Sequence, residues 1–342
     1  MTATRDGGTT TAAPAGSQIA PAVGRRRGER VAAVLQRNGA LLVLVLVSAA
    51  AAAAFPAFAT SDNLRDVLVQ TSFLALVAFG MTFVILTGGI DLSVGSVYAL
   101  GGVLVAVGSG HGAVVGIALP LLCCAAIGLV QGLVIAKGGL PPFIVTLAGL
   151  LGVRGLVLAV TDEGGTTRTI PRGSAITTLG QGELLGLQYP VWIALAAFAV
   201  LVVVLRRTGF GQSLFAIGGR GGAARLMGLP VARSQVLVYV LSATLAGTAG
   251  ALLAARSSSG VPIVGVGVEL DAIAAVVIGG TLLTGGAGSL LGTACGVLLL
   301  GVIQNCINLV GSLNSSYQSV VSGAFLVLVV TIQAVLARRQ RL

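Results

Sequence analysis

One carboxylate stands out in the most apolar part of the chain. Asp91 lies in the stretch GMTFVILTGGIDLSVGSVYALGG (residues 80–102), after Gly88 and Gly89 and shortly before Ser93. A charged side chain is costly in hydrocarbon, so an acid in such a run is either functional or placed at a membrane surface. An Asp with a serine close behind it is also typical of a helix N-terminus, where the helix dipole favours an anion.

Other polar side chains interrupt the apolar runs elsewhere. Gln304, Asn305 and Asn308 share one apolar stretch, and the last two are three residues apart, on one face of a helix. These amides either line a hydrated path for a neutral polar solute or form hydrogen bonds between helices. Arg154 also lies inside an apolar run, and we expect it to face a hydrated cavity or to bond to a carbonyl.

Residues capable of catalysis are scarce. The sequence contains one histidine, and its four cysteines show no C-x-x-C spacing, so we expect no metal site. The phosphate-binding pattern G-x-x-x-x-G-K-[ST], the H-E-x-x-H pair and the G-x-S-x-G turn are all missing from the sequence. The sequence therefore predicts a protein that is not an enzyme and holds no cofactor of its own.

Composition indicates the class of protein that positions these residues. Of 342 residues, 56% are hydrophobic and 9% are charged, whereas soluble domains carry about 25% charged residues. The net charge of +10 is concentrated at the ends of apolar runs, where basic residues orient helices in a bilayer. We therefore expect an all-α, polytopic integral membrane protein, and no binding of nucleic acid.

The apolar runs define the expected membrane spans. A transmembrane helix needs about 20 apolar residues, and this rule predicts about ten spans, or about eight if the shortest runs do not cross. Most basic residues face the cytoplasm if both termini lie there, as the positive-inside rule requires. The short runs 190–205 and 270–284 are typical of broken helices or half-spans. The expected spans are 40–59, 66–87, 93–109, 113–136, 143–161, 190–205, 235–256, 270–284, 288–310 and 318–337.

The chain divides into a tail and one membrane domain. Residues 1–38 are rich in Thr, Ala, Gly and Pro, which predicts a disordered, basic cytoplasmic tail. Residues 39–342 then form a single transmembrane domain. Its longest connections are an external loop at 162–189 and a cytoplasmic segment at 206–234.

Small residues and a short internal sequence repeat suggest how the helices of the domain pack. Ser242, Ala246, Gly250 and Ala254 recur every fourth position, as do Gly288, Gly292 and Gly296, so each set lies on one helix face and allows close packing. The stretches VILTGGIDLSVGS and VVIGGTLLTGGAGS each join two apolar runs through Gly-Gly and a serine. Transporters often contain such repeats, with broken helices where the repeats meet.

Three stretches resemble one protein family. GMTFVILTGGIDLSVGS (80–96) resembles the signature of permease subunits of bacterial ABC sugar importers, the ribose, xylose, arabinose and galactose group of the branched permease superfamily. ELDAIAAVVIGGTLLTGGAGSLLGTACGVLLLGVIQNCINLVG (269–311) is similar to the family's C-terminal half, and FAIGGRGGAARLMGLPV (215–231) to its cytoplasmic coupling segment. With the pattern of spans, the resemblance covers roughly residues 40–337.

The resemblance implies a function and a set of partners. The chain would be a permease for a monosaccharide in the bacterial inner membrane, paired with a second permease subunit, most simply a copy of itself. A separate cytoplasmic ATPase would bind ATP and Mg²⁺, and an extracytoplasmic binding protein would deliver the sugar. The sequence has few residues suited to bind a sugar tightly and no nucleotide-binding motif. Both observations agree with ATP binding and sugar capture by separate partner proteins.

The coupling segment departs from the usual importer pattern Glu-Ala-Ala-x-x-x-Gly. Gly222 stands where the acid is expected, while the small residues and the glycine spacing are kept. A contact to the ATPase through that acid is therefore in doubt. The candidate coupling residues are Arg220, Ala223, Ala224, Arg225 and Gly228.

Within such a permease, three roles are open to Asp91 and its neighbours Gly88, Gly89 and Ser93. Asp91 caps the next helix, contacts the coupling apparatus from the cytoplasmic side, or touches the solute. Capping chemistry favours the first role.

Two other functions compete with the ATP-driven permease. A secondary transporter driven by an ion gradient would need acids or histidines inside its spans, but Asp91 and Asp271 lie at predicted span ends. A membrane assembly subunit that transports nothing would need only the glycine-rich packing faces.

Overall fold

The computed structural model describes residues 25–310, 320, 323–324 and 327, with side chains described from residue 39 onward. The chain forms two units, Met1–Gln36 and Arg37–Leu342. Helix α1 (Arg25–Ala54) begins inside the tail that the sequence predicts to be disordered. The part of that tail before residue 25 lies outside the described residues.

Six helices among the described residues are long and apolar enough to cross a membrane. Shorter apolar helices cover Gly39–Ala54 of α1 and all of α3 (Val94–Ser109). Each of these eight segments falls on an expected span, and the described residues do not confirm the predicted count of about ten. The six longer helices are α2 (Ser61–Leu86), α4 (Ala113–Gly138), α5 (Pro142–Ala159), α7 (Tyr189–Arg207), α9 (Val231–Ser257) and α11 (Leu290–Val310).

The two remaining expected spans have different outcomes. The run 270–284 forms α10 (Val268–Ile278), a helix of 11 residues followed by a non-helical stretch to Ser289. At about 1.5 Å per residue such a helix is far too short to cross a bilayer. The run is therefore a half-span, one of the forms expected for it. The last expected span, 318–337, lies almost entirely outside the described residues.

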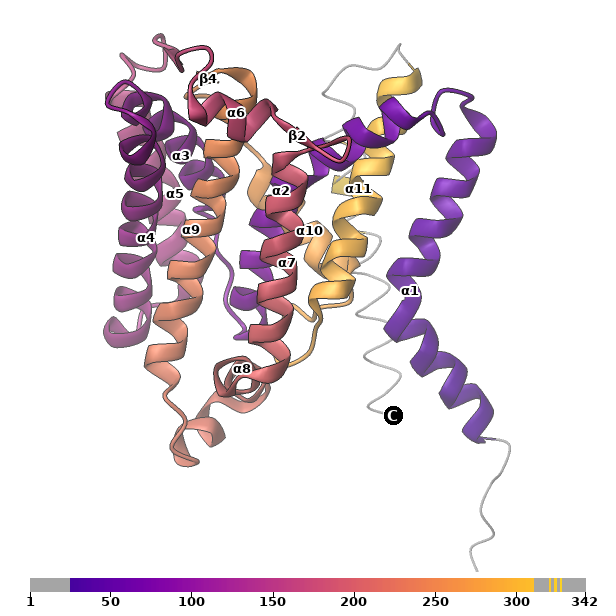
Figure 1. Ribbon diagram of the computed structural model, residues 1–342. Helices are drawn as coiled ribbons and strands as arrows, with labels where there is room; N and C mark the ends of the chain where they lie inside the picture. Colours follow the sequence, from indigo (N-terminus) through magenta and orange to yellow (C-terminus); the bar gives the residue numbers. More distant parts are fainter. Residues whose placement is uncertain (1–24, 311–319, 321–322, 325–326, 328–342) are drawn as a thin grey trace, which may run out of the picture. The chain divides into compact units, whose positions relative to one another are not determined.

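Short elements cover both ends of the helices of the second unit (Figure 1). At one end lie α6 (Ala175–Gln181), the antiparallel pair of β1 (Arg168–Thr169) with β4 (Ser259–Gly260), and the pair of β2 (Glu183–Leu184) with β3 (Leu187–Gln188). The predicted external loop 162–189 is thus largely structured. At the other end lies α8 (Gly209–Leu226), inside the predicted cytoplasmic segment.

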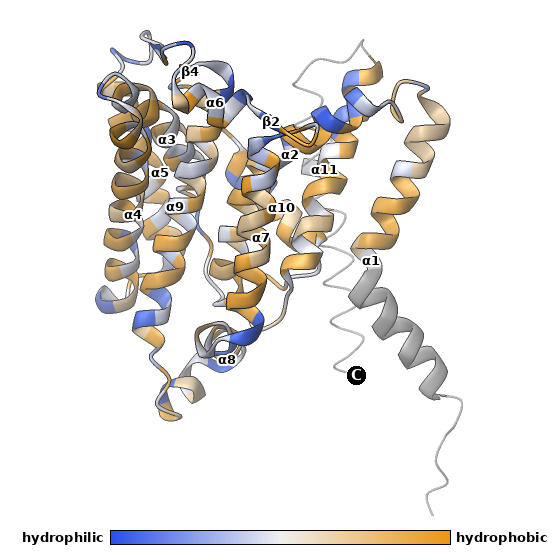
Figure 2. Cartoon of the chain, viewed as in Figure 1, coloured by the Kyte–Doolittle hydropathy of each residue, from blue (hydrophilic) through white to orange (hydrophobic). Residues whose placement is uncertain are grey.

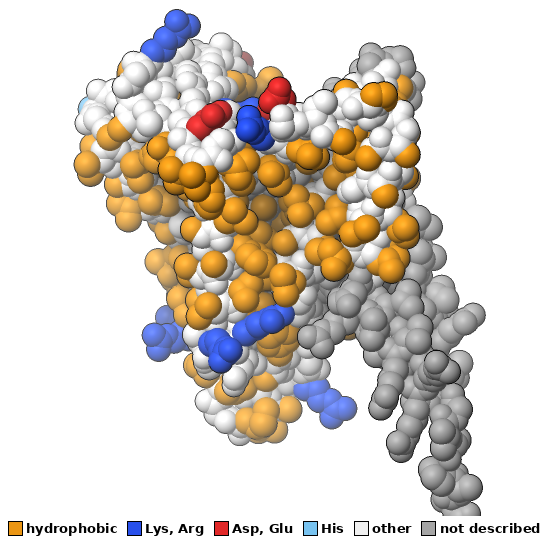
Figure 3. Space-filling model, turned by 45° about the vertical axis from the view of Figure 1, so that its right-hand side comes forward, with side chains coloured by type: hydrophobic (Ala, Val, Ile, Leu, Met, Phe, Trp, Pro, Cys, Tyr) orange, Lys and Arg blue, Asp and Glu red, His pale blue; other side chains and the backbone are white. Residues whose placement is uncertain are grey.

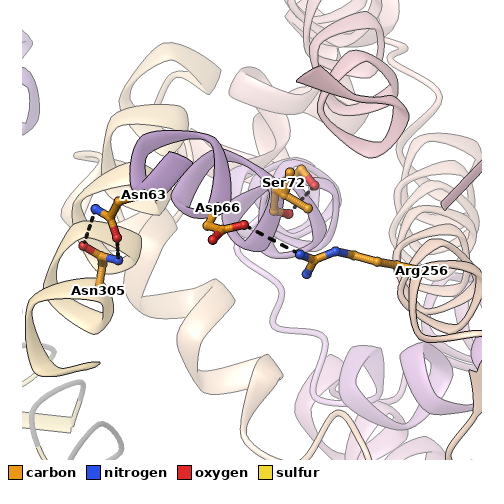
Figure 4. Close-up of polar contacts among 6 residues, drawn as sticks. Asn63, Asp66, Ser72, Arg256 and Asn305 are labelled. Carbon is orange, nitrogen blue, oxygen red and sulfur yellow. Dashed lines mark hydrogen bonds and ion pairs between the residues drawn. The ribbon is translucent and has the colours of Figure 1, made fainter. Parts of the chain in front are cut away.

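The polarity of the side chains varies along the length of the helices. Apolar side chains run along the helices, and polar ones gather toward their ends (Figure 2). On the face drawn in Figure 3, basic side chains cluster at the α8 end, while acidic side chains lie at the opposite end. At that opposite end Arg256 of α9 lies 4.0 Å from Asp66 of α2 (Figure 4).

Helix α9 is the central packing element, in contact with α2, α3 and α4. Its predicted small-residue face is confirmed, because a Cβ on Gly250 would overlap the carbonyl oxygen of Tyr98 on α3. A Cβ on Gly80 of α2 would lie 2.8 Å from the Cα of Ser242. Without side chains at these points the helix backbones approach closely, which is what association in lipid requires.

Candidate functional site

Asp91 lies in the segment that connects α2 to α3, and its side chain is fully buried. Its Oδ1 accepts hydrogen bonds from the backbone N–H of Ser93 (3.0 Å) and from the Ser93 hydroxyl (2.6 Å). Its Oδ2 accepts a hydrogen bond from the Ser242 hydroxyl on α9 (2.8 Å). Three donors of this kind stabilise a carboxylate that has no access to water.

The depth of Asp91 differs from the prediction. The sequence places it at the end of a predicted span, but its partner Ser242 lies near the middle of α9. The reason is that residues 87–93 are not a tight turn. Gly89 faces Tyr239 and Asp91 faces Ser242, so this non-helical segment runs along α9 before α3 begins at Val94.

This geometry bears on the three roles proposed for Asp91. The acid binds the N–H of Ser93, the residue that precedes α3, whereas the Ser93 side chain makes no capping bond itself. Because Asp91 has no exposed surface, it touches no solute in this conformation. The hydrogen bond from Ser242 to Asp91 joins the segment between α2 and α3 to α9.

Two buried polar groups beside Asp91 are left unpaired. The Ser93 hydroxyl oxygen lies 3.2 Å from Gln131 Oε1 on α4. In the described part of the chain, however, Gln131 Nε2 and Tyr239 Oη have no hydrogen-bond partner. A buried polar group without a partner costs roughly 1–3 kcal/mol. The Asp91 cluster therefore has unused hydrogen-bonding capacity at the centre of the bundle.

Arg154 bonds to carbonyls, one of the two environments expected for it. Its guanidinium donates to the carbonyl oxygens of Pro262 (3.1 Å), Val264 (2.8 Å) and Gly95 (3.5 Å). The Glu269 carboxylate, in the first turn of α10, lies within electrostatic range. Arg154 thus ties α5 to the start of α3 and to the irregular stretch that precedes α10.

The side-chain amides of Gln304, Asn305 and Asn308 on α11 lie in different environments. Asn305 and Asn63 of α2 exchange two hydrogen bonds, with N–O distances of 2.7 and 3.0 Å (Figure 4). Asn305 therefore joins two helices, as one of the two interpretations of these amides predicts. Gln304 is half-buried and Asn308 is exposed.

The predicted coupling segment contains a break. Helical geometry in α8 stops at Arg220, whose φ of −154° and ψ of 85° are extended. A second short helix follows and ends at Leu226, and Gly228, two residues further on, adopts a left-handed φ of 76°. Ala224 is fully buried against Ile217 and Val231, so it holds this helix in place and has no surface for a partner.

The exposed face of this segment differs from the prediction. Arg220, Ala223, Arg225 and Gly228 are exposed, as candidate contacts must be. The residues that sequence reasoning missed are Leu226 and Met227, which are 91% and 68% exposed. The available signal was a pair of large apolar residues inside a segment otherwise made of glycine, alanine and arginine.

A cavity of about 150 Å³ lies between α3, α4, α6, α7 and α9. Its walls are almost wholly apolar, and a polyhydroxylated solute needs hydrogen-bonding groups on its walls. The cavity is therefore a poor sugar site. It is lined by Val105, Gly116, Ile117, Pro120, Leu121, Ile176, Leu179, Ile193, Thr248, Ala251, Leu252 and Ala255.

A helical membrane bundle with interrupted helices, intramembrane polar clusters and a separate helix at one end is typical of a transport permease. The chain belongs to the family described as "Branched-chain amino acid transport system / permease component", whose model matches residues 63–330. It is therefore a transport subunit and not an enzyme, and a multi-pass protein of the bacterial inner membrane.

Similar proteins extend over most of the chain. The ribose import permease protein RbsC of Bacillus subtilis is 42% identical over 299 residues, which cover 87% of this chain and 92% of the relative. The protein of that name from Escherichia coli strain K12 is 41% identical over 301 residues, covering 87% and 94%. The L-arabinose ABC transporter permease protein AraH of Azospirillum brasilense is 37% identical over 314 residues, covering 91% of each chain. No solved structure was found to match the chain.

Proposed function

We propose that this chain is the membrane permease subunit of an ATP-driven importer for a monosaccharide. The observation that carries the proposal is the identity of about 40% to ribose and L-arabinose permeases over nearly their whole lengths. Among the described residues, the apolar cavity and the fully buried Asp91 offer no tight sugar site in a single copy. The sugar path therefore lies between this chain and a second permease subunit, and we infer that the second subunit is another copy.

The proposed orientation places both termini and α8 in the cytoplasm, with α6 and the short strands outside. It is supported by Lys137 at the end of α4 and by Arg206 and Arg207 at the end of α7, together with the basic residues around α8. An excess of such residues is typical of the cytoplasmic side. With α1, α3 and the run 318–337, and with α10 completing a crossing only together with the non-helical stretch that follows it, we propose between about eight and about ten crossings.

The proposed docking surface for the ATPase is the short helix after Arg220. Leu226 and Met227 protrude from it, and Arg220 and Arg225 are exposed beside them. Exposed apolar side chains with basic neighbours fit an apolar groove with an acidic rim. In this proposal Leu226 and Met227 make the main contact to the ATPase, in place of the acid that is missing at Gly222. ATP and Mg²⁺ bind to the ATPase, and the sugar-binding protein docks at the α6 end.

The test is reconstitution of the permease with the ATPase and sugar-binding protein encoded beside it, in liposomes. ATP hydrolysis and uptake of radiolabelled D-ribose, L-arabinose, D-xylose and D-galactose would be measured with and without the binding protein. We expect one loaded binding protein to stimulate hydrolysis and uptake together. Uptake that needs no ATP and is abolished by ionophores would favour ion-coupled transport. Failure of permease and ATPase to associate would overturn the proposal.

A further inference from the structure

Two copies of one tetrapeptide meet inside the protein. Leu-Thr-Gly-Gly occurs at residues 86–89, after α2, and at 283–286, between α10 and α11. The N–H of Gly286 donates to the carbonyl of Leu86 (3.0 Å). A Cβ on Gly285 would lie only 2.7 Å from the backbone nitrogen of Gly88. The short internal repeat in the sequence thus corresponds to a direct backbone contact between two loops.

Helix α8 packs onto this contact through Gly218. A Cβ on Gly218 would overlap both the carbonyl oxygen of Leu86 and the nitrogen of Gly286. From the other side, a Cβ on Gly286 would lie 2.8 Å from the nitrogen of Gly219. Three backbone segments therefore touch at one point, which we call the glycine junction: α8 at Gly218 and the loops 86–89 and 283–286.

Helix α8 is also anchored on its other sides. The rings of Phe210 on α8 and Phe83 on α2 stack with centroids 6.3 Å apart. The hydroxyl oxygens of Ser213 on α8 and Ser234 on α9 lie 3.2 Å apart. The first part of α8 is thus packed on the bundle, while its part after Arg220 carries the exposed residues.

Contact between backbones transmits movement better than contact between long side chains. A long side chain absorbs a small shift by changing rotamer, whereas backbone atoms in van der Waals contact either move together or separate. One loop of the junction leads through Asp91 to α3, and the other leads to α11. A shift of α8 at this point therefore displaces both broken segments at once.

We propose that the glycine junction carries the movement of α8 into the membrane domain, and that Gly218 is the positioning residue that couples ATP hydrolysis to sugar import. This inference rests on the proposed function. It adds the route by which one cytoplasmic helix acts on both halves of the bundle.

The test compares two adjacent glycines. Gly218→Ala places a methyl group against the loops, whereas a Cβ on Gly219 meets nothing within 4 Å. In the reconstituted complex with D-ribose and L-arabinose as substrates, we expect Gly218→Ala to lower the sugar imported per ATP hydrolysed by at least about tenfold, while ATP hydrolysis continues. Gly219→Ala should match the wild type. If Gly218→Ala is purified as an intact complex and imports normally, the proposal is wrong.

A tether tests the junction without relying on a variant that folds poorly. Gly219 and Ala287 are both exposed on either side of the junction. The double variant Gly219→Cys with Ala287→Cys would be treated with a short bis-maleimide. If the junction moves as one unit, tethering leaves import within about twofold of the untreated variant. Loss of import on tethering would show that α8 slides past the loops and would overturn the proposal.

Wild-type protein treated with the same reagent controls for the native cysteines. If wild-type protein imports no sugar at all, the proposed function has failed. Normal wild-type import with a neutral Gly218→Ala or a blocking tether would reject the junction alone.

Discussion

The hydroxyl of Ser242 should stabilise the fold more than any neighbouring hydroxyl on α9. It donates to Oδ2 of the fully buried Asp91 carboxylate over 2.8 Å. Leaving a buried hydrogen-bonding group without its partner costs about 1–3 kcal/mol. Ser242→Ala removes this bond, adds no bulk and leaves one carboxylate oxygen without its donor. We therefore expect the free energy of unfolding to fall by about 2 kcal/mol.

A matched control lies two residues further along the helix. The hydroxyl of Thr244 donates to the carbonyl of Val240, one turn earlier in α9, and contacts no other helix through that bond. Thr244→Ala should change the free energy of unfolding by less than about 0.5 kcal/mol, as for substitutions outside interhelical contacts.

Equilibrium unfolding in mixed micelles of rising SDS fraction measures both variants. The two changes would be compared on one preparation of lipid and detergent. Equal losses for Ser242→Ala and Thr244→Ala would mean that the buried carboxylate is not held by Ser242. The argument that Asp91 fixes the connecting segment to α9 would then fail.

Three further predictions follow from other contacts. Arg154→Gln should lower the free energy of unfolding by about 2 kcal/mol because the carbonyls lose a charged donor. Arg154→Lys should be intermediate because a lysine cannot bridge three carbonyls. Thermal unfolding in detergent would rank the two variants and the wild type, and equal stability would contradict the role of Arg154 in joining these segments. Replacing Leu226 and Met227 with serine should weaken ATPase binding by about tenfold without altering thermal stability, which co-purification at graded ATPase concentrations would detect. Asn63→Ala and Asn305→Ala should show a coupling energy of about 0.6–1.7 kcal/mol in a double-mutant cycle, and strict additivity would exclude the paired amides.

Much of the architecture was predictable from local sequence. Hydrophobic runs of about 20 residues identify membrane helices without tertiary information, and each of the six described helices that are long and apolar enough to cross a membrane falls on an expected span. The short runs 190–205 and 270–284 both predicted broken helices or half-spans. The prediction agrees with the 11-residue α10, but it is wrong for 190–205, which lies in α7, a helix long enough to cross a membrane. The small residues of α9 predicted close packing, which the contact of Gly250 with Tyr98 confirms.

The depth of Asp91 was not predictable in this way. A Gly-Gly-x-Asp pattern after an apolar run looks like a turn at a membrane surface, because glycines favour turns. Ser242, the partner that fixes the depth, is 151 residues away in the sequence. Only packing of the connecting segment along α9 makes a buried carboxylate possible there.

The predicted coupling segment contains a helix, α8, but the sequence did not indicate which of its small residues are exposed. Ala224 has the same small side chain as Ala223, yet it is buried while Ala223 is exposed. Glycines on both sides of Arg220 favour a break there, but only packing against Ile217 and Val231 decides that Ala224 is the buried one of the two.

By itself the sequence determined the class of protein and most of the membrane helices, because apolar length and composition act locally. The family was indicated by the resemblance of three stretches of residues. The tertiary structure alone decided which backbones touch. Gly218 and Gly219 are indistinguishable in the sequence, but one is pressed against two loops and the other faces open space. Contacts between segments more than sixty residues apart depend on the packing of the whole bundle, and the proposed role of the glycine junction depends on those contacts.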